Sequence, residues 1–179
     1  MEDIIMMKNK IVKKLDEIFE NKNKTEVRQE QYQRIEKETQ VKIPEELRYI
    51  IENYDGIFIN DDIGIQGIEI SPFAHRGYEV VNVFLGVNKN ENIYTVYQIV
   101  KDEIPFHGIP IAEMDGGNYI LLNADDKIYV WLHDEEPGKD CYLLANDFED
   151  FIMRFEKLPV EEENKECHII AEYSDDFWD

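Results

Sequence analysis

The segment from residue 109 to residue 151 constrains the fold more than any other part of the chain. Its apolar residues form short runs separated by turns rich in Asp, Gly and Asn: 109–112, 119–123, 127–132 and 141–144. Short alternating runs joined by such turns are typical of sequential antiparallel strands. The segment therefore predicts a β meander, followed by a helix that Asn146 or Asp147 can cap.

Helical patterns dominate the first third of the chain. Residues 2–20 repeat apolar side chains every three to four positions, as an amphipathic helix does. A second helical stretch begins at Thr25. A third begins at Pro44, which suits the first turn of a helix, and Gly56 can end it in a left-handed conformation.

Short β-like runs and one more helix connect this part to the meander. The β-like runs are 57–59, 68–70 and 78–85. Asn90 can cap the helix, which runs through Val100. This order of elements predicts an α+β fold, with helices packed on one side of a mainly antiparallel sheet. We expect residues 1–24 to form an N-terminal helical extension, residues 25–158 one domain, and residues 159–179 an acidic tail with an extra strand near 167–171.

Charge limits the partners of this chain. It carries 19 basic and 40 acidic residues, a formal net charge of −21, and residues 1–40 hold nine of each sign. The whole acidic excess therefore lies beyond residue 40. A surface this negative repels nucleic-acid phosphates and anionic lipid, whereas it attracts basic proteins and speeds their capture. The alternative that acidity serves solubility alone stays open.

The sequence also predicts a cytoplasmic location. The N-terminal segment places acidic residues before a short apolar patch and lysines after it, the reverse of a signal peptide. No apolar run approaches the roughly 20 residues needed to cross a bilayer. Cys141 and Cys167 have no metal-like spacing, and we expect both thiols to be reduced and inert.

Three blocks of the sequence resemble the SUKH superfamily. The first, 43–56, starts Ile-Pro-Glu-Glu-Leu and ends Asn-Tyr-Asp-Gly; the second, 84–112, joins Phe-Leu-Gly to two Ile-Pro pairs. The third, 115–151, runs from Asp-Gly-Gly-Asn to a closing Asn-Asp-Phe-Glu-Asp-Phe. The resemblance spans about 28–157 and implies the α+β fold. Bacterial members of this superfamily are mostly immunity proteins of polymorphic toxin systems, and a yeast regulator of cell-wall synthesis also belongs to it.

No pattern in the sequence indicates catalysis, a metal or a cofactor. The histidines are scattered and lack the His-x-x-x-His spacing of a helical zinc site: His75, His107, His133 and His168. Asp125-Asp126 does not continue as a calcium loop, and Gly116-Gly117 lacks the Lys-Ser/Thr of a phosphate loop. The SUKH resemblance implies no shared catalytic residues, so we expect no enzyme.

Two segments are candidates for recognition. The first is the loop 133–140 between two predicted strands, because loops on rigid scaffolds commonly carry binding. We expect four of its side chains to be solvated and to contact the partner: Asp134, Glu135, Glu136 and Asp140. The second is the tail, which sets aromatic residues among eight acidic ones. Its alternative interpretation is that Ile169 and Ile170 pack on the sheet and the last residues are disordered.

Together these observations predict an immunity protein that binds a cognate toxin domain and occludes its active site. A nuclease is suggested as the toxin, because a basic substrate-binding face would complement the charge of this chain. The alternative is a non-enzymatic regulatory or scaffold protein of the same fold with no toxin partner. The oligomeric state stays open.

Overall fold

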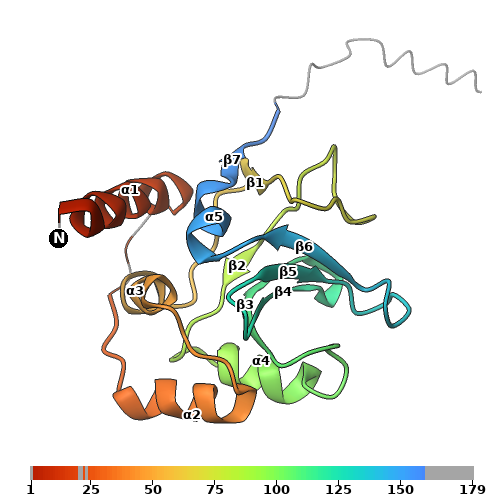
Figure 1. Cartoon of the computed structure of the whole chain (residues 1–179), viewed down its shortest axis with the longest axis horizontal. Helices are drawn as coiled ribbons and strands as arrows, with labels where there is room; N and C mark the ends of the chain where they lie inside the picture. The colour runs from red at the N-terminus through yellow and green to blue at the C-terminus, as the bar shows by residue number, and fades with distance from the viewer. Residues whose placement is uncertain (1, 20–21, 23, 160–179) are drawn as a thin grey trace, which may run out of the picture.

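The computed structural model describes residues 2–19, 22 and 24–159, with side chains from residue 10 onward. Its elements follow one another as α1 (Glu2–Ile18), α2 (Gln29–Thr39), α3 (Glu45–Tyr54), β1 (Ile63–Ile65), β2 (Val83–Phe84), α4 (Ile93–Val100), β3 (Gly108–Glu113), the 3-10 turn η1 (Asp115–Gly117), β4 (Tyr119–Asn123), β5 (Ile128–Trp131), β6 (Cys141–Ala145), α5 (Phe148–Met153) and β7 (Phe155–Lys157). Figure 1 shows the sheet bordered by α3 on the left and by α2 and α4 below.

Within the described residues, five strands form one antiparallel sheet in the order β2-β3-β4-β5-β6. Strands β3 to β6 are neighbours in sequence and in space, so the predicted meander is confirmed. Its turns use left-handed backbone conformations, with φ of 74° and 77° at Gly116 and Gly117 and 62° at Asp126. Glycine adopts such angles without steric cost, and Asp tolerates them better than most residues. The antiparallel sheet and the helices beside it together confirm the predicted α+β class.

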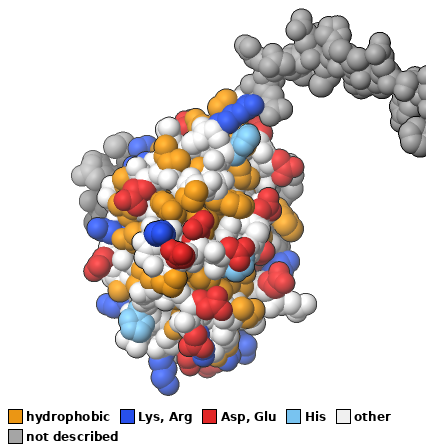
Figure 2. Space-filling view, turned by 90° about the vertical axis from the view of Figure 1, so that its right-hand side faces the viewer, with side chains coloured by type: hydrophobic (Ala, Val, Ile, Leu, Met, Phe, Trp, Pro, Cys, Tyr) orange, Lys and Arg blue, Asp and Glu red, His pale blue; other side chains and the backbone are white. Residues whose placement is uncertain are grey.

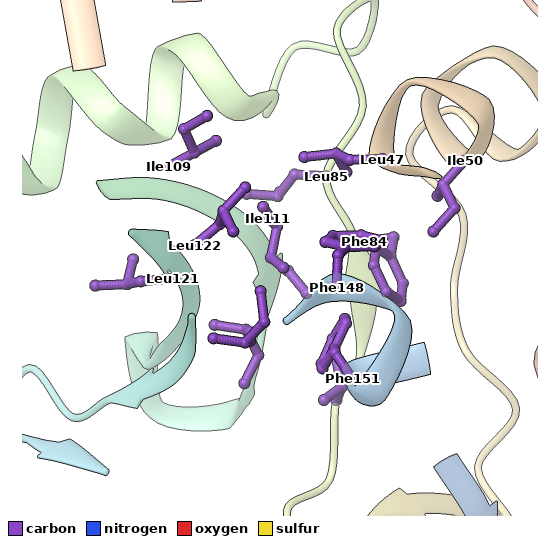
Figure 3. Close-up of a cluster of buried hydrophobic side chains, with 14 of the residues drawn as sticks. Leu47, Ile50, Phe84, Leu85, Ile109, Ile111, Leu121, Leu122, Phe148 and Phe151 are labelled. Atoms are coloured by element: carbon purple, nitrogen blue, oxygen red, sulfur yellow. The ribbon is translucent and has the colours of Figure 1, made fainter. Parts of the chain in front are cut away.

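The helices enclose the core on one side of this sheet. Helices α2 and α4 pack against β3, α5 packs against β6, and α1 and α3 pack against α5. Figure 3 shows Phe84 of β2 between Ile50 of α3 and Phe151 of α5. The Phe84 ring lies 5.9 Å from the Phe151 ring and 5.4 Å from the Phe19 ring. Such aromatic contacts add to the hydrophobic stabilisation from burial.

Helix α1 contributes to the same core. Ile11, Leu15 and Ile18 are buried in it with Phe19, which follows the helix. The Tyr54 hydroxyl of α3 also donates a 2.8 Å hydrogen bond to an Asp16 carboxylate oxygen of α1. The division of the chain near residue 24 stays a prediction. The predicted acidic tail and its strand near 167–171 lie outside the described residues, except for Pro159.

Helix boundaries differ from the sequence prediction at two places. The second helix begins at Gln29 and not at Thr25. The Thr25 backbone N–H donates a hydrogen bond to the Glu52 carbonyl at 3.0 Å. Helix α4 is capped by Asn92 rather than Asn90, because the Asn92 side chain accepts hydrogen bonds from the backbone N–H groups at 94 and 95. Asp147 caps α5 by accepting from the Asp150 N–H at 2.8 Å, one of the two predicted caps.

The predicted runs 57–59, 68–70 and 78–85 are only partly strands. Strand β2 is confined to Val83–Phe84, and Phe58 forms an isolated bridge with Val83. The run 68–70 lies beside β6 and donates two backbone hydrogen bonds to it, yet it bends instead of continuing as a strand. Gly67 makes this bend possible, since a Cβ there would lie 2.5 Å from the Glu69 carbonyl oxygen.

The sequence prediction missed one strand pair. Strands β1 and β7 form a two-stranded antiparallel sheet, with Ile63 opposite Lys157. Among the residues that the structure describes, no helix is both long enough and apolar enough to span a membrane.

Candidate partner-binding face

The acidic loop, residues 133–140, connects β5 to β6 and has a defined backbone. The Lys139 N–H donates to the Glu136 carbonyl at 2.9 Å, which closes a turn over Pro137 and Gly138. Gly138 has a φ of 88°. Proline followed by a residue of positive φ is the pattern of a type II turn. The loop therefore holds its acidic side chains on a fixed backbone.

Asp140 departs from the sequence prediction. Its side chain was expected to be solvated, but the residue is only 4% exposed. One carboxylate oxygen accepts from the Trp131 indole N–H at 3.2 Å, and the other accepts from the Gly138 N–H at 2.9 Å. A carboxylate that satisfies two donors next to the sheet holds the loop in place. Asp140 is therefore a structural residue of the loop, and the expectation of a solvated side chain was wrong for it.

The other three predicted acidic residues are exposed. Asp134 lies next to His133, with 3.1 Å between a carboxylate oxygen and Nε2, and 89% of its side chain is accessible to solvent. Glu136 pairs with Lys139 at 2.9 Å, an exposed contact of little energetic weight. Glu135 is exposed as well. These three side chains are thus available to a partner.

Asn118 connects the acidic loop to the glycine turn η1. Its side-chain oxygen accepts from the His133 N–H at 3.1 Å, and its NH₂ group donates to the Asp115 carbonyl at 2.9 Å. Asn118 is only 5% exposed. Gly117 lies in van der Waals range of the His133 ring, and its φ of 77° is one that side-chain-bearing residues rarely adopt. The two turns on either side of the β4–β5 hairpin are therefore held together.

A second segment, here called the arm (residues 66–79), borders the acidic loop. It presents three large hydrophobic side chains to solvent: Ile68 at 40%, Ile70 at 61% and Phe73 at 46% exposure. Figure 2 looks at the side of the molecule that lies on the right in Figure 1 and shows acidic and hydrophobic side chains interspersed on it. Apolar side chains rimmed by charged ones are typical of protein interaction sites.

The arm is hydrogen-bonded to β6 and also to itself. A Glu69 carboxylate oxygen accepts from the Leu143 N–H of β6 at 2.6 Å. Further along, the Ser71 N–H donates to Glu79 Oε1 at 3.2 Å. Glu79 is only 1% exposed, and burial raises the pKa of its carboxyl above the ordinary value. These contacts fix the backbone that carries the exposed hydrophobic side chains.

The arm and the acidic loop meet at a small surface hollow of about 160 Å³. Its lining includes Phe73 of the arm, Asn118 beside η1, and Asp134 and Glu135 of the loop. The hollow is too small for a drug-sized ligand, since such sites span roughly 300–1,000 Å³. An aromatic ring and two carboxylates around a shallow depression suit a side chain of a partner protein.

The described residues offer no clear catalytic or metal chemistry. They contain no group of three or more His, Cys, Asp and Glu side chains that could hold a metal ion. Burial and the neighbouring Asp140 carboxylate raise the pKa of the Cys141 thiol to about 12. This thiol therefore stays protonated at neutral pH and is a poor nucleophile. Cys167 lies outside the described residues.

The chain belongs to the SMI1 / KNR4 family (SUKH-1), whose sequence model it matches over residues 26–154. It is also 26% identical over 161 residues to the SPbeta prophage-derived uncharacterized protein YokK of Bacillus subtilis (strain 168). That similarity covers 82% of this chain and 84% of the relative. No solved structure shows a significant match. The family consists in general of non-enzymatic immunity or regulatory proteins, and the resemblance predicted from the sequence is confirmed.

Sequence reasoning missed two features of this face. The apolar residues of the arm escaped it because the run 68–70 was interpreted as a strand, whose side chains would be partly buried. The role of Asn118 escaped it because a turn asparagine is usually explained by its own turn. A Ser-Pro-Phe sequence after an alternating Ile-Glu-Ile run was the available signal for an exposed aromatic residue.

Proposed function

We propose that this chain is an immunity protein that binds a cognate toxin domain and occludes its active site. The observation that carries the proposal is the face where the exposed Phe73 lies beside the solvated carboxylates of Asp134 and Glu135. Family membership supports the class of function, and the face supplies a means of binding. The contact residues are the acidic loop side chains Asp134, Glu135 and Glu136, with Asp140 holding the loop.

The toxin domain that fits this face is basic, as the nucleic-acid-binding surface of a nuclease is. Electrostatic attraction brings it to the acidic loop, and apolar contacts with the arm then retain it. The acidic loop and the arm affect different steps of binding because their side chains differ in chemistry. Exposed carboxylates act at long range and accelerate association, whereas buried aromatic and aliphatic side chains slow dissociation.

A charge reversal in the loop tests the proposal. The double variant Glu135→Lys, Glu136→Lys should unfold within about 0.5 kcal/mol of wild type, because both side chains are solvated. Its affinity for the toxin should fall by about 2–5 kcal/mol, the range for losing interfacial charge pairs. The measurement is co-expression with the product of the adjacent toxin gene, scored by cell survival and by titration calorimetry of the purified pair.

A matched control separates local from global charge. The variant Glu26→Lys, Glu38→Lys makes the same change of net charge at exposed positions before and at the end of α2. It should protect cells as wild type does. Equal loss of protection in both variants would show that net charge matters and the loop does not. If wild type binds no such toxin, the alternative of a regulatory or scaffold protein of the same fold replaces the proposal.

A further inference from the structure

A groove of about 540 Å³ lies at the edge of the five-stranded sheet, and the proposed function does not use it. Its lining includes Phe58, strand β2, Lys89, Glu91 and Glu113. Turn η1 is linked to both the groove and the acidic loop: Asn82 in the groove wall donates a 2.6 Å hydrogen bond to the Asp115 carboxylate, and Asn118 connects η1 to His133.

The backbone of Phe58 is fixed at this groove, and 74% of the residue is exposed. The backbone on both sides of it is fixed to β2: the Ile59 N–H donates to the Asn82 carbonyl at 2.9 Å, and the Phe84 N–H donates to the Ile57 carbonyl at 2.9 Å. The core does not need this ring. An aromatic side chain on a fixed backbone has few rotatable bonds and loses little conformational freedom on binding, which makes it a favourable contact residue.

Carboxylates concentrate around the same groove. Glu113 ends β3 opposite Val83 and is partly buried. Burial raises the pKa of its carboxyl, and the neighbouring Glu91 and Asp115 carboxylates raise it further. Lys89 also lines the groove, but its stem lies across Gly56, where a Cβ would be 2.5 Å from Lys89 Cγ. A second cation would relieve the mutual repulsion of these acids.

The same molecule contains a filled site of this chemistry. The Arg48 guanidinium lies 4.7 Å from the centre of the Tyr32 ring, and its Nη2 lies 2.8 Å from the Glu36 carboxylate. An aromatic face and a carboxylate thus hold one arginine between α2 and α3. The edge groove offers an aromatic ring and carboxylates, but its lining contains no arginine.

We propose that the edge groove binds an arginine side chain of a partner protein. The guanidinium stacks on Phe58 and pairs with the carboxylates of Glu91 and Glu113. A planar guanidinium can stack and pair at the same time, whereas a lysine ammonium can do this less well. The inference rests on the proposed function for the source of the arginine, which is the basic toxin domain.

The groove can be tested without any toxin. N-acetyl-arginine amide is titrated into the ¹⁵N-labelled full-length protein, and the backbone amide signals of Phe58, Glu91 and Glu113 are followed. We expect saturable shifts at these three signals and weaker binding of N-acetyl-lysine amide. The variants Phe58→Ser and Glu91→Gln should each weaken arginine binding about threefold or more, the size expected for one exposed cation–π contact or ion pair.

Ile99→Ser supplies the matched control, because Ile99 on α4 is 73% exposed and loses a comparable apolar surface. It should bind the arginine derivative as wild type does. Shifts spread evenly over all exposed carboxylates, or equal binding by the Phe58→Ser and Ile99→Ser variants, would overturn the inference. The toxin-protection assay with the loop variants has a separate readout, so failure of the groove and failure of the immunity function are distinguishable.

Discussion

Carboxylates serve different purposes in the helical layer and at the rim of the sheet. In the helical layer, formed by α2 and α3, Glu36 pairs with Arg48, and Arg48 lies on the Tyr32 ring. At the rim, here meaning the arm, the acidic loop and the edge groove, acidic side chains face solvent beside exposed hydrophobic ones. The first arrangement stabilises the fold. The second leaves both charge and apolar surface available to a partner.

The comparison teaches that position in a loop does not by itself make an acidic residue functional. Asp140 belongs to the acidic loop, yet it behaves like the carboxylates of the helical layer, because both of its oxygens accept hydrogen bonds from the protein. Asp134 and Glu135, in the same loop, are instead exposed to solvent. The loop therefore contains both a structural carboxylate and carboxylates that can contact a partner.

The largest stability effect is expected from Asp140→Ala. The substitution leaves the Trp131 indole N–H and the Gly138 N–H without their acceptors. Losing hydrogen bonds to a buried charged group should lower the free energy of unfolding by about 2–3 kcal/mol, as measured by urea denaturation. Asp134→Ala is the control and should change it by less than about 0.5 kcal/mol. Equal effects would abolish the distinction between the two residues.

A smaller effect is expected from Arg48→Met in the helical layer. Methionine keeps most of the apolar stem but loses the pair with Glu36 and the stack on Tyr32, so the free energy of unfolding should fall by about 1 kcal/mol. Lys42→Met removes the same charge from an exposed position and should have little effect. If both variants are equally destabilised, the helical layer depends on net charge and not on this pair.

The buried carboxyl of Glu79 should make the stability of the protein depend on pH. Its pKa is raised in the folded protein by burial, so the folded state binds the proton more tightly than the unfolded chain. The contribution of Glu79 to the free energy of unfolding should therefore fall as pH rises from the unfolded value near 4.5 through the folded pKa. Glu79→Gln should remove this slope, and exposed Glu103→Gln should retain it. An unchanged slope in Glu79→Gln would show that the carboxyl is not desolvated.

The meander could be predicted because its information is local. The turns at Asp115–Gly117 and Asp126 follow directly from residues that accept positive φ, and each joins strands adjacent in sequence. The closing helix had a local signal too, since Asp147 was one of two candidate caps. The family resemblance over about 28–157 supported the order of elements, and the family model matches residues 26–154.

What could not be predicted depends on distant contacts or on near-equivalent residues. Strands β1 and β7 have three residues each and lie far apart in sequence, so neither carries a strong pattern of its own. Asn90 and Asn92 are equally good caps by residue type, and only the fit of the side chain to the N–H groups at 94 and 95 decides between them. The burial of Asp140 likewise depends on Trp131, nine positions earlier.

The central claim is that the exposed acidic charge of the rim captures a basic partner. Its most direct test is stopped-flow association of wild type with the toxin domain proposed as its partner, over a salt series. The association rate should fall steeply as salt rises, because screening shortens the range of the field to about 10 Å at 0.1 M, whereas dissociation should change little. An association rate that stays constant across the series would contradict the account.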